Sequence, residues 1–101
     1  MAEVLNDNNF EEKTKDGITL IDFYADWCGP CRIVGPIVDE LSKDLTDVNV
    51  VKVDVDESPQ TAMKFGIRTI PTIVLLKDGK EVNRAIGIMS KPQLLQFIKS
   101  A

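Results

Sequence analysis

The chain has 101 residues, of which 44% are hydrophobic, which is enough for one compact domain with its own core and too few for two. Its 16 acidic and 12 basic residues are spread without blocks of one sign, so we expect neither nucleic acid nor a membrane surface as a partner. The polar, acidic N-terminus is unlike a secretory signal or a transit peptide. The longest aliphatic run, Ile73–Leu76, is far shorter than the roughly 20 apolar residues of a membrane span. We therefore expect a single cytoplasmic domain over residues 1–101.

Strand-like and helix-like segments alternate from the N-terminus. A short strand at Glu3–Leu5 precedes a first helix, for which Asn6 offers an N-cap and Gly17 a stop. Ile18–Ala25 is a nearly continuous apolar run, which is typical of a strand buried on both faces of a sheet. Apolar residues then recur at helical spacing, namely Val34, Ile37, Val38, Leu41 and Leu45. Asn49–Asp56 alternates valines with polar residues and predicts a strand parallel to the previous one.

The second half of the chain predicts a short helix, a hairpin and a last helix. Ser58-Pro59 is an N-cap and first-turn signal, and Gly66 ends this short helix. Asp78-Gly79 between two apolar runs indicates a hairpin of antiparallel strands. The last helix opens with Ser90 and Gln93 in capping-box spacing. Together these segments predict an α/β fold with a central mixed β-sheet of about four to five strands, parallel in its first half and flanked on both faces by about four helices.

The chain has two cysteines, Cys28 and Cys31, and no histidine. A structural zinc site needs four Cys or His ligands, so one here would have to be shared between two chains or completed by carboxylates, and we expect no bound metal. A structural disulfide that closes about four residues would stabilise the fold by only about 2 kcal/mol. The third interpretation is a reactive dithiol.

The position of Cys28 favours redox chemistry. It follows a buried strand and precedes a helix, so its sulfur lies near the helix N-terminus, where unpaired N–H groups and the dipole lower the pKa of a thiol. The N–H of Cys31 is the obvious donor to this sulfur, because Pro30 has none. We predict an exposed Cys28 as the attacking sulfur and a shielded Cys31 that reacts second. Trp27 is either a core aromatic or, next to a reactive cysteine, a cover for the site that contacts the partner.

Several motifs together resemble the thioredoxin family. WCGPC spans Trp27–Cys31, Asp22-Phe23 precedes it, and GIRTIPT spans Gly66–Thr72. Further matches, in chain order, are Pro36, Lys52 and Gly87. A bare C-x-x-C motif is a weak signal because zinc sites and oxidases share it, whereas this set covers nearly the whole chain. The resemblance implies a thioredoxin fold and a protein-disulfide reductase.

The resemblance also implies catalytic roles. Asp22 would be a buried carboxyl with a raised pKa that relays a proton to or from Cys31 through water. The alternative is a strand-end residue that reaches water or a backbone donor. Lys52 would lie near Asp22 and tune its protonation, although a solvated lysine on the polar side of its strand explains the pattern equally well. Gly29 and Pro30 match the reducing members of the family rather than its oxidases or isomerases.

For partner binding, the resemblance implies a cis Ile70-Pro71 bond that faces the cysteines, although such bonds are cis only about 5% of the time. Ile70 would then hydrogen-bond an extended segment of the substrate. A shallow apolar groove around Cys28 would be completed by Gly66, Ile67, Gly87 and Ile88. Helix-cap and strand-bend roles are the alternatives for the two glycines. Ile88 stands where the family often has a smaller residue, which bears on the choice of partner.

The resemblance implies electron transport in cell redox homeostasis, with disulfide-containing proteins as substrates. The intrinsic Cys28–Cys31 disulfide would be the redox-active centre, without a bound cofactor, and an NADPH-dependent thioredoxin reductase would recycle it. We expect a monomer. The alternatives are a disulfide oxidase or isomerase, and a binding module that uses the same groove as a scaffold.

Overall fold

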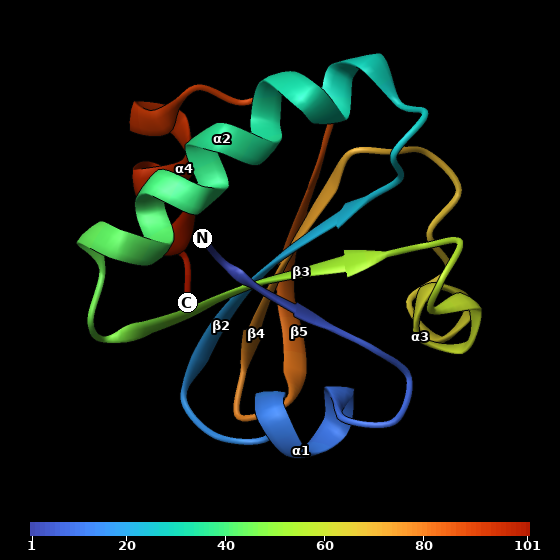
Figure 1. Cartoon of the computed structure of the whole chain (residues 1–101). Helices are drawn as coiled ribbons and strands as arrows, with labels where there is room; N and C mark the ends of the chain where they lie inside the picture. Colours follow the sequence, from blue (N-terminus) through green and yellow to red (C-terminus); the bar gives the residue numbers. More distant parts are fainter.

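The computed structural model describes all 101 residues as a five-stranded sheet with four helices (Figure 1). The strands are β1 (Glu3–Leu5), β2 (Ile18–Tyr24), β3 (Val48–Asp54), β4 (Thr72–Lys77) and β5 (Lys80–Ile86). The helices are α1 (Phe10–Thr14), α2 (Gly29–Asp44), α3 (Pro59–Lys64) and α4 (Lys91–Ile98). None of these helices combines the length and the apolar character that a membrane crossing requires.

The sheet is mixed, with the strand order β1-β3-β2-β4-β5. β1 and β2 both pair in parallel with β3, and β4 pairs antiparallel with both β2 and β5. This confirms the predicted sheet, which is parallel in its first half. β2 lies in the middle, so its backbone groups are hydrogen-bonded on both edges, as the continuous apolar run of its sequence indicates.

The turn between β4 and β5 confirms the predicted hairpin. Asp78 has a φ of 50° and Gly79 a φ of 81°. Positive φ at both central residues is the conformation that two-residue hairpins favour, because its twist matches that of the flanking strands. Glycine adopts it without a steric cost, and aspartate tolerates it better than most residues do.

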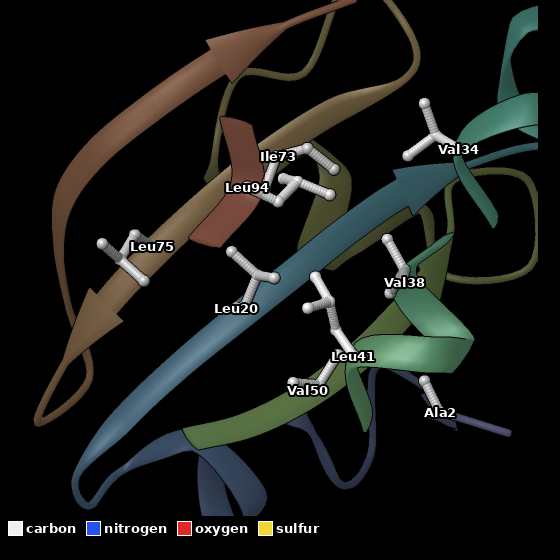
Figure 2. Close-up of a cluster of buried hydrophobic side chains, with 9 residues drawn as sticks. All are labelled: Ala2, Leu20, Val34, Val38, Leu41, Val50, Ile73, Leu75 and Leu94. Carbon is white, nitrogen blue, oxygen red and sulfur yellow. The ribbon is translucent and has the colours of Figure 1, made fainter. Parts of the chain in front are cut away.

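One face of the sheet is covered by α2 and α4. Figure 2 shows side chains of the central strands directed toward residues of these two helices. The cluster consists of Ala2, Leu20, Val34, Val38, Leu41, Val50, Ile73, Leu75 and Leu94. The helical spacing of Val34, Val38 and Leu41 therefore reflects one buried stripe of α2.

The opposite face of the sheet packs against α1 and against the end of α3. Phe10 of α1 and Phe65 after α3 have ring centroids 5.5 Å apart, and Phe65 is equally close to Phe23 of β2. The other buried residues of this cluster are Leu5, Ile21, Val51, Val53, Val74 and Leu76. Helices thus cover both faces, as predicted, and strands β2, β3 and β4 contribute alternate side chains to each cluster.

The predicted N-cap at Asn6 is wrong. Helix α1 begins at Phe10, with Asn9 in the cap position. The side chain of Asn6 instead accepts hydrogen bonds from the N–H groups of Asn8 and Asn9, at 2.9 and 3.1 Å. Asparagine satisfies neighbouring backbone donors equally well in a turn and at a helix start, so the residue type alone did not distinguish the two.

The predicted N-cap position of α3 is confirmed, but another residue accepts the hydrogen bonds of the free N–H groups at the helix start. Ser58 occupies the cap position but its side chain makes no capping hydrogen bond. The carboxylate of Asp7 accepts from the N–H groups of Gln60 and Thr61 instead, at 3.2 and 2.8 Å. In α4 the predicted capping box is confirmed, because Ser90 and Gln93 bond each other's backbone N–H.

We expect a large difference in stability between the same substitution at two neighbouring positions of α4. Leu94 is 0% exposed and belongs to the cluster of Figure 2, whereas Leu95 is 38% exposed. Leu94→Ala should lower the free energy of unfolding by about 2–5 kcal/mol, because it leaves a cavity among α2, α4 and the sheet. Leu95→Ala carries the same change in helix propensity and should cost less than about 1 kcal/mol. Urea denaturation measures both, and equal losses would contradict this placement of the core.

Candidate active site

Cys28 and Cys31 form a disulfide where β2 passes into α2. Cys28 is the N-cap residue of α2, with an extended backbone, and Pro30 follows in the first turn. The N–H of Cys31 donates to Sγ of Cys28 at 3.2 Å, which confirms the predicted donor. One of the N–H groups that a helix leaves free at its start thus points at this sulfur, an arrangement that favours a thiolate when the pair is reduced.

The predicted difference in exposure between the two cysteines is wrong for this disulfide form. Cys28 is 4% exposed and Cys31 5%. Both pack with Ala25, and the side chain of Ile70 lies against the same small cluster. Sγ of Cys28 is 3.8 Å from the carbonyl oxygen of Ile70. The segment at Ile70 therefore covers the sulfur that the sequence placed at the surface.

Trp27 lies at the surface beside the disulfide. It is 69% exposed, which excludes the core alternative. Its indole Nε1 donates to a carboxylate oxygen of Asp56 at 2.9 Å. This hydrogen bond holds the ring in one orientation while most of the residue remains open to solvent, as suits a contact surface for a partner.

The Ile70-Pro71 peptide bond is cis, as predicted. Gly87, which follows β5, donates its N–H to the carbonyl of Pro71 at 2.9 Å. The fold therefore brings Ile70, Pro71 and Gly87 to the same end of the sheet as Cys28, although they are far apart in the sequence.

The other predicted groove residues occupy separate environments. Gly66 has a φ of +61°, and its N–H bonds the carbonyl of Met63, so its observed interactions are those of a helix end. Ile67 packs against the core cluster beneath α1, and Ile88 is 52% exposed. None of the cavities in the structure is lined by Gly66, Ile67, Gly87 or Ile88. The groove stays a prediction.

Asp22 lies on β2 and is 0% exposed. Neither of its carboxylate oxygens has a hydrogen-bond partner. Burial raises the pKa of this carboxyl to about 7, against the opposing charge of Lys52 and together with the like charge of Asp39. The predicted raised pKa is thereby confirmed, and the alternative of a residue that reaches water or a backbone donor is wrong.

Lys52 lies directly opposite Asp22 in the register of β2 and β3, yet it forms no ion pair with it. Its ammonium instead lies 3.2 Å from Oδ1 and 3.3 Å from Oδ2 of Asp39 on α2. The lysine side chain is only 12% exposed, so the alternative of a solvated lysine is wrong. The lysine faces α2 because it shares a side of β3 with Val50, which packs under that helix.

A cavity of about 300 Å³ lies on the lysine side of the disulfide. Its lining residues are Tyr24, Ala25, Asp26, Cys31, Arg32, Gly35, Pro36, Asp39 and Lys52. Sequence reasoning missed Gly35 and Asp39. The signal was available, because Cys31, Gly35 and Asp39 follow one another at intervals of four residues and so share a face of the helix. No group of three or more potential metal ligands is present.

We expect the buried carboxyl of Asp22 to make stability fall as the pH rises. The folded protein holds this proton up to about pH 7, whereas the unfolded chain releases it near pH 3.8, the ordinary pKa of an aspartate. Between these values the folded state binds more protons, so the free energy of unfolding should decrease by up to about 1.4 kcal/mol per pH unit. Asp22→Asn removes this titration, and its stability should rise relative to the original protein from pH 5 to pH 8. Parallel stability curves in urea denaturation would contradict a buried, protonated Asp22.

Comparisons with known proteins agree with this geometry. The sequence model of the thioredoxin family matches residues 1–100. The chain is 42% identical over 98 residues to a thioredoxin of Chlamydia trachomatis, covering 97% of this chain and 96% of the relative. It is 41% identical over 93 residues to a thioredoxin of Bacillus subtilis, covering 91% and 89%.

The fold has a close counterpart among solved structures. A mutant thioredoxin from Halobacterium salinarum superposes with a TM-score of 0.90 at 37% sequence identity, over 98% of this chain and 88% of that chain. Residues 1–100, which the family model matches, include the whole sheet, all the helices and the cysteine pair. The chain therefore belongs to the thioredoxin family.

Proposed function

We propose that Cys28 and Cys31 carry out the disulfide reduction of this family, with Cys28 as the nucleophile. The observation that carries the assignment is the position of Sγ of Cys28, which caps α2 and accepts the N–H of Cys31. A thiolate on Cys28 is stabilised there by the helix start, whereas Cys31 lies inside the first turn without such a position. This asymmetry distinguishes a catalytic pair from a structural staple.

The reaction consists of two exchanges. The Cys28 thiolate attacks one sulfur of a partner's disulfide, which forms a mixed disulfide and releases the first partner thiolate. The Cys31 thiolate then attacks Sγ of Cys28 and releases the second partner thiolate. Two electrons pass to the partner, and the Cys28–Cys31 disulfide of this structure is the oxidised product.

Asp22 acts as the base in the second exchange. Cys31 must lose its proton before it can attack, and the chain has no histidine to take it. A carboxyl with a pKa of about 7 can both accept and return a proton at neutral pH. Water in the cavity that Cys31 and Lys52 both line would connect the thiol with the neighbourhood of Asp22.

The remaining assignments follow the family. The partners are disulfide-containing proteins and an NADPH-dependent thioredoxin reductase, which returns two electrons to the pair, so the protein needs no bound cofactor. Exposed Trp27 and Ile88, with Ile70 beside the sulfur, would meet the partner's chain. Gly29 and Pro30 support a reductant rather than an oxidase. The protein acts as a monomeric, cytoplasmic domain over residues 1–101.

We expect the two cysteines to behave differently when each is replaced by serine. In Cys31→Ser, Cys28 should still attack the partner's disulfide, but no second sulfur is left to release the partner. A covalent complex with a disulfide-containing protein should therefore accumulate. Cys28→Ser should form little of this complex, because Cys31 is the less activated sulfur. Each variant is incubated with insulin whose disulfides are intact. Mass spectrometry of the mixture, without added reductant, then measures the amount of covalent complex that each variant forms.

Each single-cysteine variant is the control for the other, because each retains one sulfur in the same helix turn. Complex formation by Cys28→Ser alone would reverse the assignment of the nucleophile. Full biological activity of both variants would instead support a binding module in which redox turnover is incidental.

We expect Ile88 to affect the recognition of protein substrates but not the chemistry of the sulfurs. Ile88→Glu places a charge on the exposed rim and should raise KM for a protein disulfide about tenfold or more, which corresponds to about 1.4 kcal/mol. The rate with a small disulfide such as oxidised glutathione should not change. Val82→Glu is the matched control, because Val82 is 44% exposed on β5. Equal effects of the two substitutions on KM would contradict a contact at Ile88.

A further inference from the structure

Lys52 lies between two carboxylates and is paired with only one of them. It is the register partner of Asp22, and its positive charge lowers the pKa of the buried carboxyl. Its ammonium nevertheless extends to both oxygens of Asp39, at 3.2 and 3.3 Å, and leaves both oxygens of Asp22 without a partner. The residues around Lys52 must therefore determine that its ammonium pairs with Asp39 and not with Asp22.

Gly35 makes room for this orientation. It lies one helical turn before Asp39 on the same face of α2, and it is buried. A Cβ at this position would be 3.3 Å from Nζ of Lys52, which is tighter than an ordinary van der Waals contact. The absence of a side chain at Gly35 thus lets the ammonium lie across the helix and reach Asp39.

Asp39 is itself held in place. Its Oδ1 accepts the N–H of Ala2, just before β1, at 3.0 Å. Burial opposes ionisation, but this hydrogen bond, the hydrogen bond and charge of Lys52 and the N-terminal amine lower the pKa of Asp39 overall. Because the side chain of Asp39 is 22% exposed and that of Lys52 only 12%, solvent screens their attraction less than at an open surface.

We propose that Asp39 is a positioning residue of the redox site, which holds the ammonium of Lys52 away from Asp22 and so keeps the Asp22 carboxyl able to take up and release a proton at neutral pH. The inference deepens the proposed proton relay and rests on it for its functional meaning. A Lys52 released from Asp39 would turn toward the unpartnered oxygens of Asp22. The ionised form of Asp22 would then be favoured, and the carboxylate would be a weaker base that no longer takes the proton of Cys31 readily.

The charged surroundings of Asp22 come from two elements. β3 contributes Lys52 and α2 contributes Asp39, with opposite effects. On β4 the register partner is the uncharged Ile73. Loss of the Asp39 charge and movement of Lys52 toward Asp22 would therefore both lower the pKa of Asp22. An experiment must separate these two effects.

The test is a titration of the Asp22 carboxyl by carbon-13 NMR in the reduced protein. Asp39→Asn should move the midpoint to lower pH by about one unit, because an opposite charge close to a carboxylate lowers its pKa by about 1–3 units. Asparagine keeps an oxygen that can accept the N–H of Ala2, so the anchor of β1 is retained. Glu40→Gln is the matched control, since it removes the same charge from the next position of α2, where Glu40 pairs with Lys91 at 2.6 Å. The control should leave the midpoint unchanged.

A second pair of variants separates the position of Lys52 from the charge of Asp39. In a Lys52→Met background the same Asp39→Asn change should shift the midpoint by less than half as much, because no ammonium is left to move. An unchanged midpoint in Asp39→Asn, or equal shifts in both backgrounds, would overturn the positioning role. The titration requires no turnover, so its result does not depend on whether the protein reduces disulfides. Likewise, a failed titration test would leave the proposed reductase activity standing.

Discussion

Strand β2 lies between β3 and β4, with a pair of helices over each face of the sheet, and nearly all its side chains are buried. This burial holds the fold together, since β2 contributes Leu20 to one core cluster and Ile21 and Phe23 to the other. It also takes Asp22 out of water without giving it a partner. The same strand ends at the start of α2, so the packing that stabilises the protein also fixes where the cysteines lie.

Two electrostatic environments follow from this arrangement. The start of α2 presents a free N–H to Cys28 and favours a negative sulfur. The interior around Asp22 disfavours a negative carboxylate and raises its pKa to about 7. Groups whose environments push their proton affinities in opposite directions are suited to divide the roles of nucleophile and base. In the proposed mechanism these groups are Cys28 and Asp22, so that the protein needs no histidine as a base.

Helix α2 joins the core to the site through two stripes of its surface. Val34, Val38 and Leu41 pack on the sheet. Beside them, a second stripe of Cys31, Gly35 and Asp39 lines the cavity over Lys52. Because both stripes belong to one rigid helix, the apolar packing sets the distance between Lys52 and Asp39. The packing of α2 on the sheet therefore both buries the core residues and places the charges that act on the carboxyl of Asp22.

The sequence by itself determined the order of strands and helices along the chain, the hairpin at Asp78-Gly79 and the cysteine pair at a helix start, because periodicity, turn residues and short spacings are local. The burial of the Asp22 carboxyl was implied only by the resemblance to the thioredoxin family. Only the tertiary structure decided that Ile70 covers Cys28, that Asp7 caps α3 and that Lys52 pairs with Asp39. These contacts join residues distant in the chain. A long side chain or a free backbone N–H can be satisfied by several partners, and the packing of the elements selects which one comes within a few ångströms.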